Sequence, residues 1–143
     1  MSASIKTILW LGLLGVACSQ PPQASANQAT AGIDSLNGRL VQAYRSRDPQ
    51  AYGVLYTDSA VFEWPAFNSV RGPAALTAMV RSNWASLRDM DLRLTVASRR
   101  VATDHATEFG RYVTLLVRQP DGSWRMDRFF GFEDSTRASA TRH

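Results

Sequence analysis

Cysteine, histidine and lysine are scarce in this chain of 143 residues. Its single cysteine, Cys18, cannot form an intramolecular disulfide. With only two histidines, His105 and His143, the sequence argues against a zinc site and against Ser-His-Asp or Cys-His catalysis. It also lacks a glycine-rich phosphate-binding loop. We therefore expect no metal and no other cofactor.

The charged residues also limit the choice of partner. The formal net charge is +4, and the basic residues, nearly all arginines, are interspersed with Asp and Glu. No basic run with interleaved aromatic residues occurs, so nucleic acid is not an expected partner despite the basic pI.

The N-terminus has the pattern of an exported bacterial protein. Lys6 precedes an apolar run from Ile8 to Ala17 that is too short to cross a membrane comfortably, so residues 1–17 are predicted to be a signal peptide. The run ends at Cys18 in a sequence that resembles the bacterial lipobox, although Gly15 stands where a large aliphatic residue is preferred. The alternatives are lipidation of Cys18, with a periplasmic or other extracytoplasmic domain anchored to the membrane only through this lipid, and simple secretion. A flexible tether is predicted for residues 18–31.

The expected folded domain covers residues 32–132, and its first part predicts three helices. Apolar residues recur at helical spacing from Ile33 to Tyr44. Asp48-Pro49 predicts an N-cap followed by proline in the first turn of a second helix, and Gly72-Pro73 predicts the start of a third. A short strand, Ser59–Trp64, is expected between the last two.

The second part of the domain predicts three consecutive strands. Apolar and polar residues alternate from Leu92 to Ala97, strand-forming residues continue from Ala106 to Val117, and the Pro120-Asp121-Gly122 turn leads to a strand from Trp124 to Phe132. Helices followed by consecutive strands indicate an α+β fold, with the helices on one face of an antiparallel sheet. Residues 133–143 have no strand pattern and are expected to be a disordered tail.

Three short segments resemble the nuclear-transport-factor-2-like superfamily, and most closely its SnoaL-like, ketosteroid-isomerase-like branch. They are Asp48 at the start of the second helix, Tyr-Thr-Asp-Ser-Ala-Val at residues 56–61, and Val-Arg-Gly at residues 70–72. The resemblance implies a cone in which a strongly curved antiparallel sheet wraps against three helices around a pocket. It also implies a possible homodimer through the outer face of the sheet.

The number of strands leaves two interpretations open. Asp121 to Trp124 could form the final hairpin of the cone, which would leave the sheet one strand short. Alternatively, the segment from Trp124 to Phe132 is the penultimate strand, and the chain ends before the last one. The second interpretation is favoured, and it predicts an unpaired edge and an open core.

The catalytic positions implied by the isomerase branch are not filled by suitable residues. The position of the carboxylate base falls on Trp64, that of the polarising tyrosine on Leu40, and that of the protonated acid near Val113. Tyr44 lies one helical turn from Leu40 and could replace it only by rearrangement. Isomerisation by that mechanism is therefore not expected.

Two carboxylates remain candidates for acid-base catalysis. Glu63 is the only carboxylate of the predicted strand Ser59–Trp64, and it would need burial or a charged neighbour to act as a base. Asp127 could act as an acid. The alternatives are a solvated or salt-bridged side chain for Glu63 and a cross-strand salt bridge for Asp127.

Two arginines suggest an anionic ligand. Strand alternation places Arg111 beside Phe109 and Arg128 beside Trp124 on apolar faces, where a guanidinium needs a carboxylate or an anionic ligand as partner. A bulge at Gly110 or pairing with Glu63, Glu108 or Asp127 is the alternative. The predicted pocket wall consists of Tyr44, Tyr56, Trp64, Trp84, Phe109, Arg111 and Arg128.

Three functions remain open. The first is binding of a small hydrophobic molecule, anionic if the arginines face the pocket. The second is a SnoaL-like enzyme that performs acid-base chemistry on a carbonyl compound, as an isomerase, cyclase or hydrolase. The third is a structural or interaction lipoprotein. Binding is favoured, because the recognised catalytic positions are unoccupied.

Overall fold

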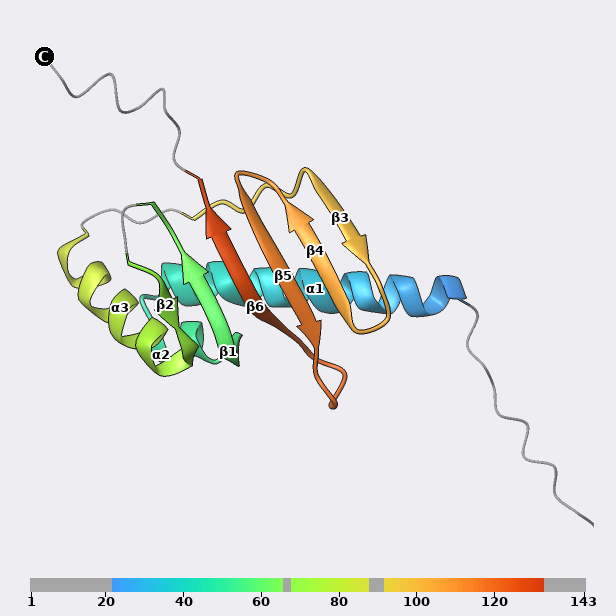
Figure 1. Ribbon diagram of the computed structural model, residues 1–143, viewed down its shortest axis with the longest axis horizontal. Helices are drawn as coiled ribbons and strands as arrows, with labels where there is room; N and C mark the ends of the chain where they lie inside the picture. Colours follow the sequence, from blue (N-terminus) through green and yellow to red (C-terminus); the bar gives the residue numbers. More distant parts are fainter. Residues whose placement is uncertain (1–21, 66–67, 88–91, 133–143) are drawn as a thin grey trace, which may run out of the picture.

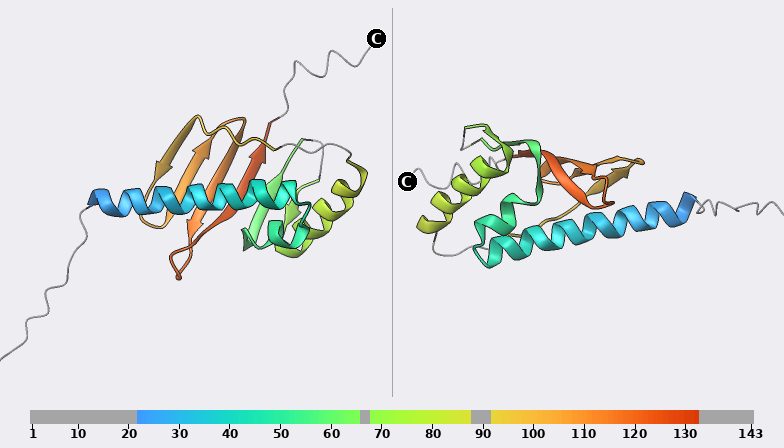
Figure 2. Two further views of the ribbon diagram at one scale, coloured as in Figure 1. Left: turned by 180° about the vertical axis from the view of Figure 1, so that it is seen from behind. Right: turned by 90° about the horizontal axis from the view of Figure 1, so that it is seen from below.

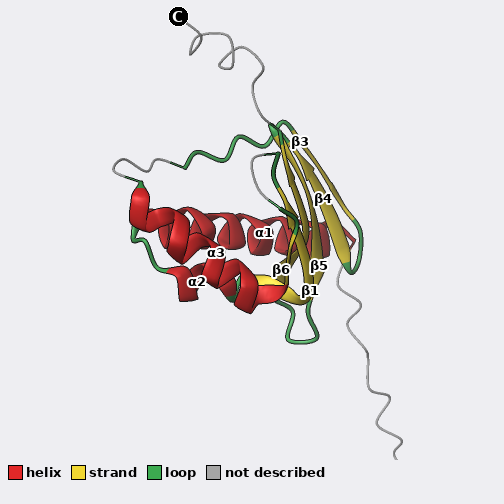
Figure 3. Cartoon of the chain, turned by 60° about the vertical axis from the view of Figure 1, so that its left-hand side comes forward, coloured by secondary structure: helices red, strands yellow, loops and turns green. Residues whose placement is uncertain are grey.

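The computed structural model describes residues 22–65, 68–87 and 92–132, and it confirms an α+β fold. Three helices lie on one side of a single curved sheet (Figures 1 and 3). The elements are α1 (Pro22–Arg45), α2 (Pro49–Gly53), β1 (Tyr56–Glu63), β2 (Val70–Arg71), α3 (Gly72–Ser86), β3 (Ser98–Val101), β4 (His105–Phe109), β5 (Tyr112–Arg118) and β6 (Trp124–Gly131).

The sheet has six strands in the order β2-β1-β6-β5-β4-β3. The expectation of a wholly antiparallel sheet is wrong at one place, because β1 and β6 are parallel, with Val61 opposite Arg128 and Phe62 opposite Phe129. A parallel pair needs a long crossover, and here the connection contains α3 and four strands, β2 to β5. The last described strand therefore lies inside the sheet (Figure 1).

The three strands predicted after α3 are four in the structure. The segment 92–97 is not a strand: Leu92 and Leu94 pack against the core from a connecting segment, and an extended connection alternates its side chains as a strand does. The ladder begins at Ala97, whose N–H donates to the carbonyl of Phe109 at 2.8 Å. The stretch predicted as one strand, 106–117, turns back at Gly110, where an added Cβ would overlap the carbonyl oxygen of Thr95.

Helix α1 begins before the predicted start of the domain. The tether expected over residues 18–31 is helical from Pro22 onward, and Ala29 is buried with Ile33 against the sheet. Gly32 allows close packing, because a Cβ there would lie 2.8 Å from Cδ1 of Trp124. Figure 2 shows α1 crossing one whole face of the sheet. The second half of the expected tether therefore belongs to the folded domain.

The two shorter helices begin where the sequence predicts. The Asp48 side chain accepts hydrogen bonds from the backbone N–H groups of Gln50 and Ala51, at 3.0 and 2.9 Å, and thus caps α2. Helix α3 begins at Gly72, whose φ of 76° few other residues tolerate. Together with the end of α1, these helices cover the β1 end of the sheet (Figure 3).

Within the described residues, no helix combines the length and apolar character needed to cross a membrane. The predicted signal peptide, Cys18 and the predicted tail at 133–143 lie outside the described residues.

Candidate functional site

An apolar cavity of about 190 Å³ lies where α1, α2 and α3 meet β1. Its wall is formed by Tyr44, Tyr52, Phe62, Trp64, Met79, Val80, Asn83, Trp84, Leu87 and Leu92. Half of these residues are aromatic and none is acidic. Such a wall suits a small hydrophobic molecule.

Ring contacts fix the helical side of the cavity. The indole of Trp84 meets Tyr44 edge-on with centroids 5.3 Å apart, and it meets Tyr52 in the same way at 5.5 Å. On the sheet side, Phe129 stacks on Phe62 at 5.1 Å and on Trp64 at 6.4 Å. Because aromatic pairs of this geometry add to the stability gained by burial, the wall is largely preformed.

Two buried tyrosines supply a hydrogen-bond donor beside this apolar wall. The hydroxyl of Tyr56 donates to that of Tyr52 at 2.8 Å. Burial raises the pKa of Tyr52 to about 12 and that of Tyr56 well above its usual value of 10, so both remain protonated at neutral pH. Tyr52 lines the cavity, and its oxygen accepts from Tyr56, so its own O–H can donate to a ligand oxygen.

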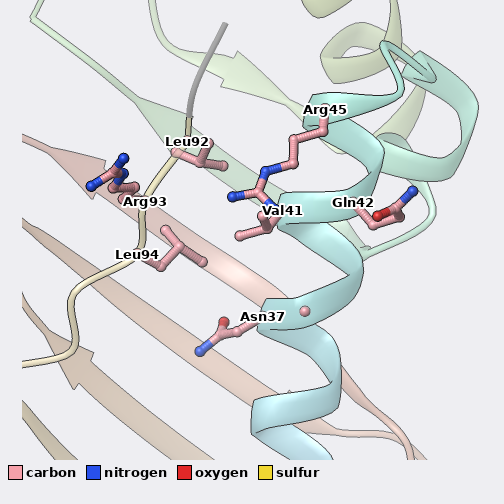
Figure 4. Close-up of a pocket in the computed structure, with 8 residues that line it drawn as sticks. Asn37, Val41, Gln42, Arg45, Leu92, Arg93 and Leu94 are labelled. Carbon is pink, nitrogen blue, oxygen red and sulfur yellow. The ribbon is translucent and has the colours of Figure 1, made fainter.

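A more open groove of about 520 Å³ adjoins the cavity, and Leu92 lines both. The groove runs between α1 and the segment 92–94, and Figure 4 shows Arg45 extending from α1 toward Leu92 and Leu94. The charged residues that line it are Arg45 and Arg93. Two guanidinium groups therefore line the groove that adjoins the apolar cavity.

The structure brings together only part of the predicted pocket wall. Tyr44, Trp64 and Trp84 line the cavity as predicted. Tyr56 does not line the cavity; it is fully buried, and its hydroxyl donates to that of Tyr52. Phe109, predicted as a wall residue, is 39% exposed on the sheet face opposite the helices, because β4 turns its other face, with Ala106, toward the core.

Arg128 does not lie on the apolar face. A β-bulge at Asp127 adds one residue to β6, since Leu115 pairs with Arg128 but Leu116 pairs with Met126. The bulge reverses the alternation, so Arg128 lies on the outer side. There its Nη1 contacts Asp127 Oδ2 at 2.6 Å and donates to the carbonyl of Ser59 at 3.2 Å. Arg128 therefore pairs with Asp127, which is one of the alternatives given for the arginines above. The bulge that changes its orientation is at Asp127 and not at Gly110.

The other predicted charged residues also lie away from the cavity wall. Arg111 is exposed in the turn between β4 and β5. Asp127 accepts hydrogen bonds from the hydroxyls of Thr57 at 2.6 Å and Ser59 at 3.0 Å, on the outer side of the sheet. Glu63 is exposed and accepts from Ser69 at 3.4 Å. Neither predicted catalytic carboxylate lines the cavity.

The residues at the implied isomerase positions are apolar and differently placed. Trp64 lines the cavity, Leu40 is buried in the core between α1 and the sheet, and Val113 is half-buried on the outer side of β5. Among the described residues, no group of three His, Cys, Asp or Glu side chains could hold a metal ion.

Sequence reasoning missed a buried polar cluster beneath α1. Glu108 is fully buried on the core side of β4, and its carboxylate is held by Asn37 of α1 and Arg99 of β3. Nearby on β5, the hydroxyl of Tyr112 is buried and has no hydrogen-bond partner among the described residues. The signal that could have found this cluster is Gly110. If β4 ends before a turn at Gly110, its alternation can be assigned separately from that of β5, with Ala106 and Glu108 on the core side.

Comparisons with known proteins agree with this architecture. An NTF2-like protein with a cystatin-like fold from Novosphingobium aromaticivorans is 22% identical, with a TM-score of 0.68 over 82% of this chain and 90% of that one. A ketosteroid isomerase-like protein from Erwinia carotovora atroseptica is 20% identical, with a TM-score of 0.62 over 73% of this chain and 95% of that one. These likenesses show the fold alone, and no curated protein matches the chain. The sequence pattern of the SnoaL-like domain matches residues 38–137, and the chain therefore belongs to the SnoaL-like domain family.

Proposed function

We propose that this chain binds a small hydrophobic carboxylate. In this proposal, the apolar part of the ligand fills the cavity beside Trp84, and its carboxylate lies toward the groove. The observation that carries the proposal is the preformed aromatic cavity of about 190 Å³, whose described wall residues include no Asp or Glu.

The groove supports the anionic part of the proposal. Arg45 and Arg93 line it, and Leu92 separates it from the cavity, so a chain that passes Leu92 can place its carboxylate near these guanidinium groups. They take the role that the sequence assigned to Arg111 and Arg128. The free O–H of Tyr52 offers a donor to an oxygen within the cavity.

Enzymatic acid-base chemistry is the weaker alternative. A general base must lie within hydrogen-bond reach of the proton that it removes, and the wall residues that the structure describes include no carboxylate or histidine. Tyr52 and Tyr56 could polarise a carbonyl, but the reaction would still lack a base. Binding therefore accounts for the cavity wall with fewer assumptions.

The proposal can be tested by thermal unfolding of the full-length chain with decanoate and with decan-1-ol. Decanoate at a hundredfold excess over its Kd should stabilise the fold by about 2.7 kcal/mol, and decan-1-ol should stabilise it less. Arg45→Gln should remove most of this difference, whereas Arg39→Gln, on an exposed part of α1 outside the groove, should not. If neither compound raises the midpoint, the binding proposal fails. Equal shifts with both compounds would refute its anionic part.

We further propose that the domain is exported and attached to a membrane through a lipid on Cys18. The support is the lipobox-like sequence that precedes Cys18. Expression of the native chain and of Cys18→Ala, followed by membrane fractionation, tests this. An equal membrane-bound fraction for both chains would show that no lipid anchor is attached through that thiol.

A further inference from the structure

Glu108 is the only described carboxylate that is fully buried. The amide nitrogen of Asn37 donates to both of its oxygens, at 3.1 and 3.0 Å, and Nε of Arg99 donates to Oε1 at 2.7 Å. Arg99 in turn contacts Asp34 of α1 at 2.6 Å. A buried carboxylate needs such partners, and these contacts satisfy Glu108.

That arrangement fixes the orientation of the Asn37 side chain. Its nitrogen is directed to Glu108, so its oxygen, Oδ1, must lie on the other side of the amide plane. Asn37 lines the groove, and Figure 4 shows the oxygen directed up the groove and the nitrogen directed toward the sheet. No described residue donates a hydrogen bond to Oδ1. The wall of the groove therefore presents an oriented acceptor on the same helix as Arg45.

Tyr112, which does not itself line the groove, carries a second buried polar group near Glu108. Its hydroxyl is buried without a partner among the described residues, although nearly all buried polar groups in proteins are hydrogen-bonded. Burial, and then the nearby charge of Glu108, raises the pKa of Tyr112 to about 12, so the hydroxyl keeps its proton and remains a donor. An oxygen atom of a water molecule or ligand near Glu108 would satisfy it.

We propose that the groove is the polar subsite of the ligand site and that Asn37 Oδ1 accepts a hydrogen bond from a hydroxyl group of the ligand. The ligand class is then a hydrophobic hydroxy acid, with its carboxylate near Arg45 and its hydroxyl at Asn37. Glu108 and Arg99 are positioning residues, which hold the Asn37 amide in its orientation. This inference rests on the proposed binding function. It adds that the ligand carries a hydroxyl group, which Asn37 recognises.

The experiment is isothermal titration of the full-length chain with 3-hydroxydecanoate and decanoate. One additional hydrogen bond contributes about 0.5–1.5 kcal/mol, so 3-hydroxydecanoate should bind about 2- to 12-fold more tightly. Asn37→Leu should remove this preference and leave the affinity for decanoate unchanged. Gln42→Leu is the matched control, because Gln42 is an amide that lines the same groove but does not contact Glu108, and it should keep the preference.

Each outcome separates this inference from the binding function. If both acids bind wild type equally, the hydroxyl subsite is refuted and the binding function stands. If neither acid binds, the binding function fails, and the subsite fails with it. If Asn37→Leu weakens both acids equally, Asn37 has only a structural role and the inference is refuted. Should Asn37→Leu fail to fold, Asn37→Ser replaces it, since serine removes the amide oxygen and leaves room for a water molecule to hydrogen-bond Glu108.

Discussion

Replacing Gly131 with alanine should disrupt one wall of the cavity. Gly131 ends β6, where a Cβ would overlap Cε3 and Cζ3 of Trp64 and would lie 2.7 Å from its Cδ2. The indole is rigid and already stacks on Phe129, so it cannot yield as the end of a flexible side chain would. Overpacking of this kind costs about 1–3 kcal/mol.

Gly38→Ala is the matched control for this substitution. Gly38 lies within α1, and an added Cβ there meets no atom within 4 Å. Alanine in a helix is about 0.5–1 kcal/mol more favourable than glycine, so Gly38→Ala should stabilise the protein. The two variants should therefore differ by about 1.5–4 kcal/mol in their free energy of unfolding.

Urea unfolding followed by tryptophan fluorescence measures this difference, provided that both variants have the same dependence of free energy on urea. Because Trp64 lines the cavity, Gly131→Ala should also weaken the binding of decanoate. A Gly131→Ala protein with the unfolding midpoint and decanoate affinity of wild type would refute the placement of Trp64 against β6.

Three further predictions concern stability and association. Because the pKa of Tyr52 is about 12 in the fold and about 10 in the unfolded chain, its contribution of about 3 kcal/mol is complete below pH 10 and is lost as the pH rises through 12. A urea unfolding midpoint that stays constant as the pH is raised from 9 to 12 would contradict this. In Tyr52→Phe the midpoint should decrease less over the same pH range. Asp48→Ala should lower the free energy of unfolding by about 1 kcal/mol through loss of the α2 cap, whereas Asp48→Asn should cost less; equal losses in urea unfolding would refute the capping role. We also propose that two copies pair through the outer sheet face, where Leu115 is half-buried, and sizing chromatography should show a dimer that Leu115→Lys converts to a monomer. A monomeric wild-type chain would refute this pairing.

The helices were largely predictable from sequence, because their signals are local. The Asp48-Pro49 cap and the Gly72-Pro73 start determine where α2 and α3 begin, whatever the rest of the chain does. The start of α1 was not predictable in this way. Residues 22–31 have a polar composition, and what places them in the domain is packing such as that of Gly32 against Trp124.

The strand region was harder to predict, because its side-chain orientations depend on single residues. Gly110 lies in a turn beside the carbonyl of Thr95, a long-range contact that the local sequence does not show. The segment 92–97 has no sequence feature that marks it as a connection. The bulge at Asp127 places the Arg128 side chain on the opposite face of the sheet from the one that simple alternation predicts. This bulge is a feature of the pairing of β6 with β5, and no local sequence pattern indicates it. Part of the aromatic wall, namely Tyr44, Trp64 and Trp84, could be predicted from the sequence. Large aromatic side chains tend to be buried, and this tendency can be used without knowledge of the strand register.

The position of β6 has a consequence for how the protein folds. β6 joins β1, near residue 60, to β5, near residue 115, so the sheet consists of two unconnected halves until this strand is in place. Contacts that join such distant parts of a chain form slowly, because long loops must close first. The sheet cannot be completed while residues 124–131 remain within a ribosome or a translocation channel. If the chain is exported as proposed above, this topology keeps the domain open until nearly all of it has emerged.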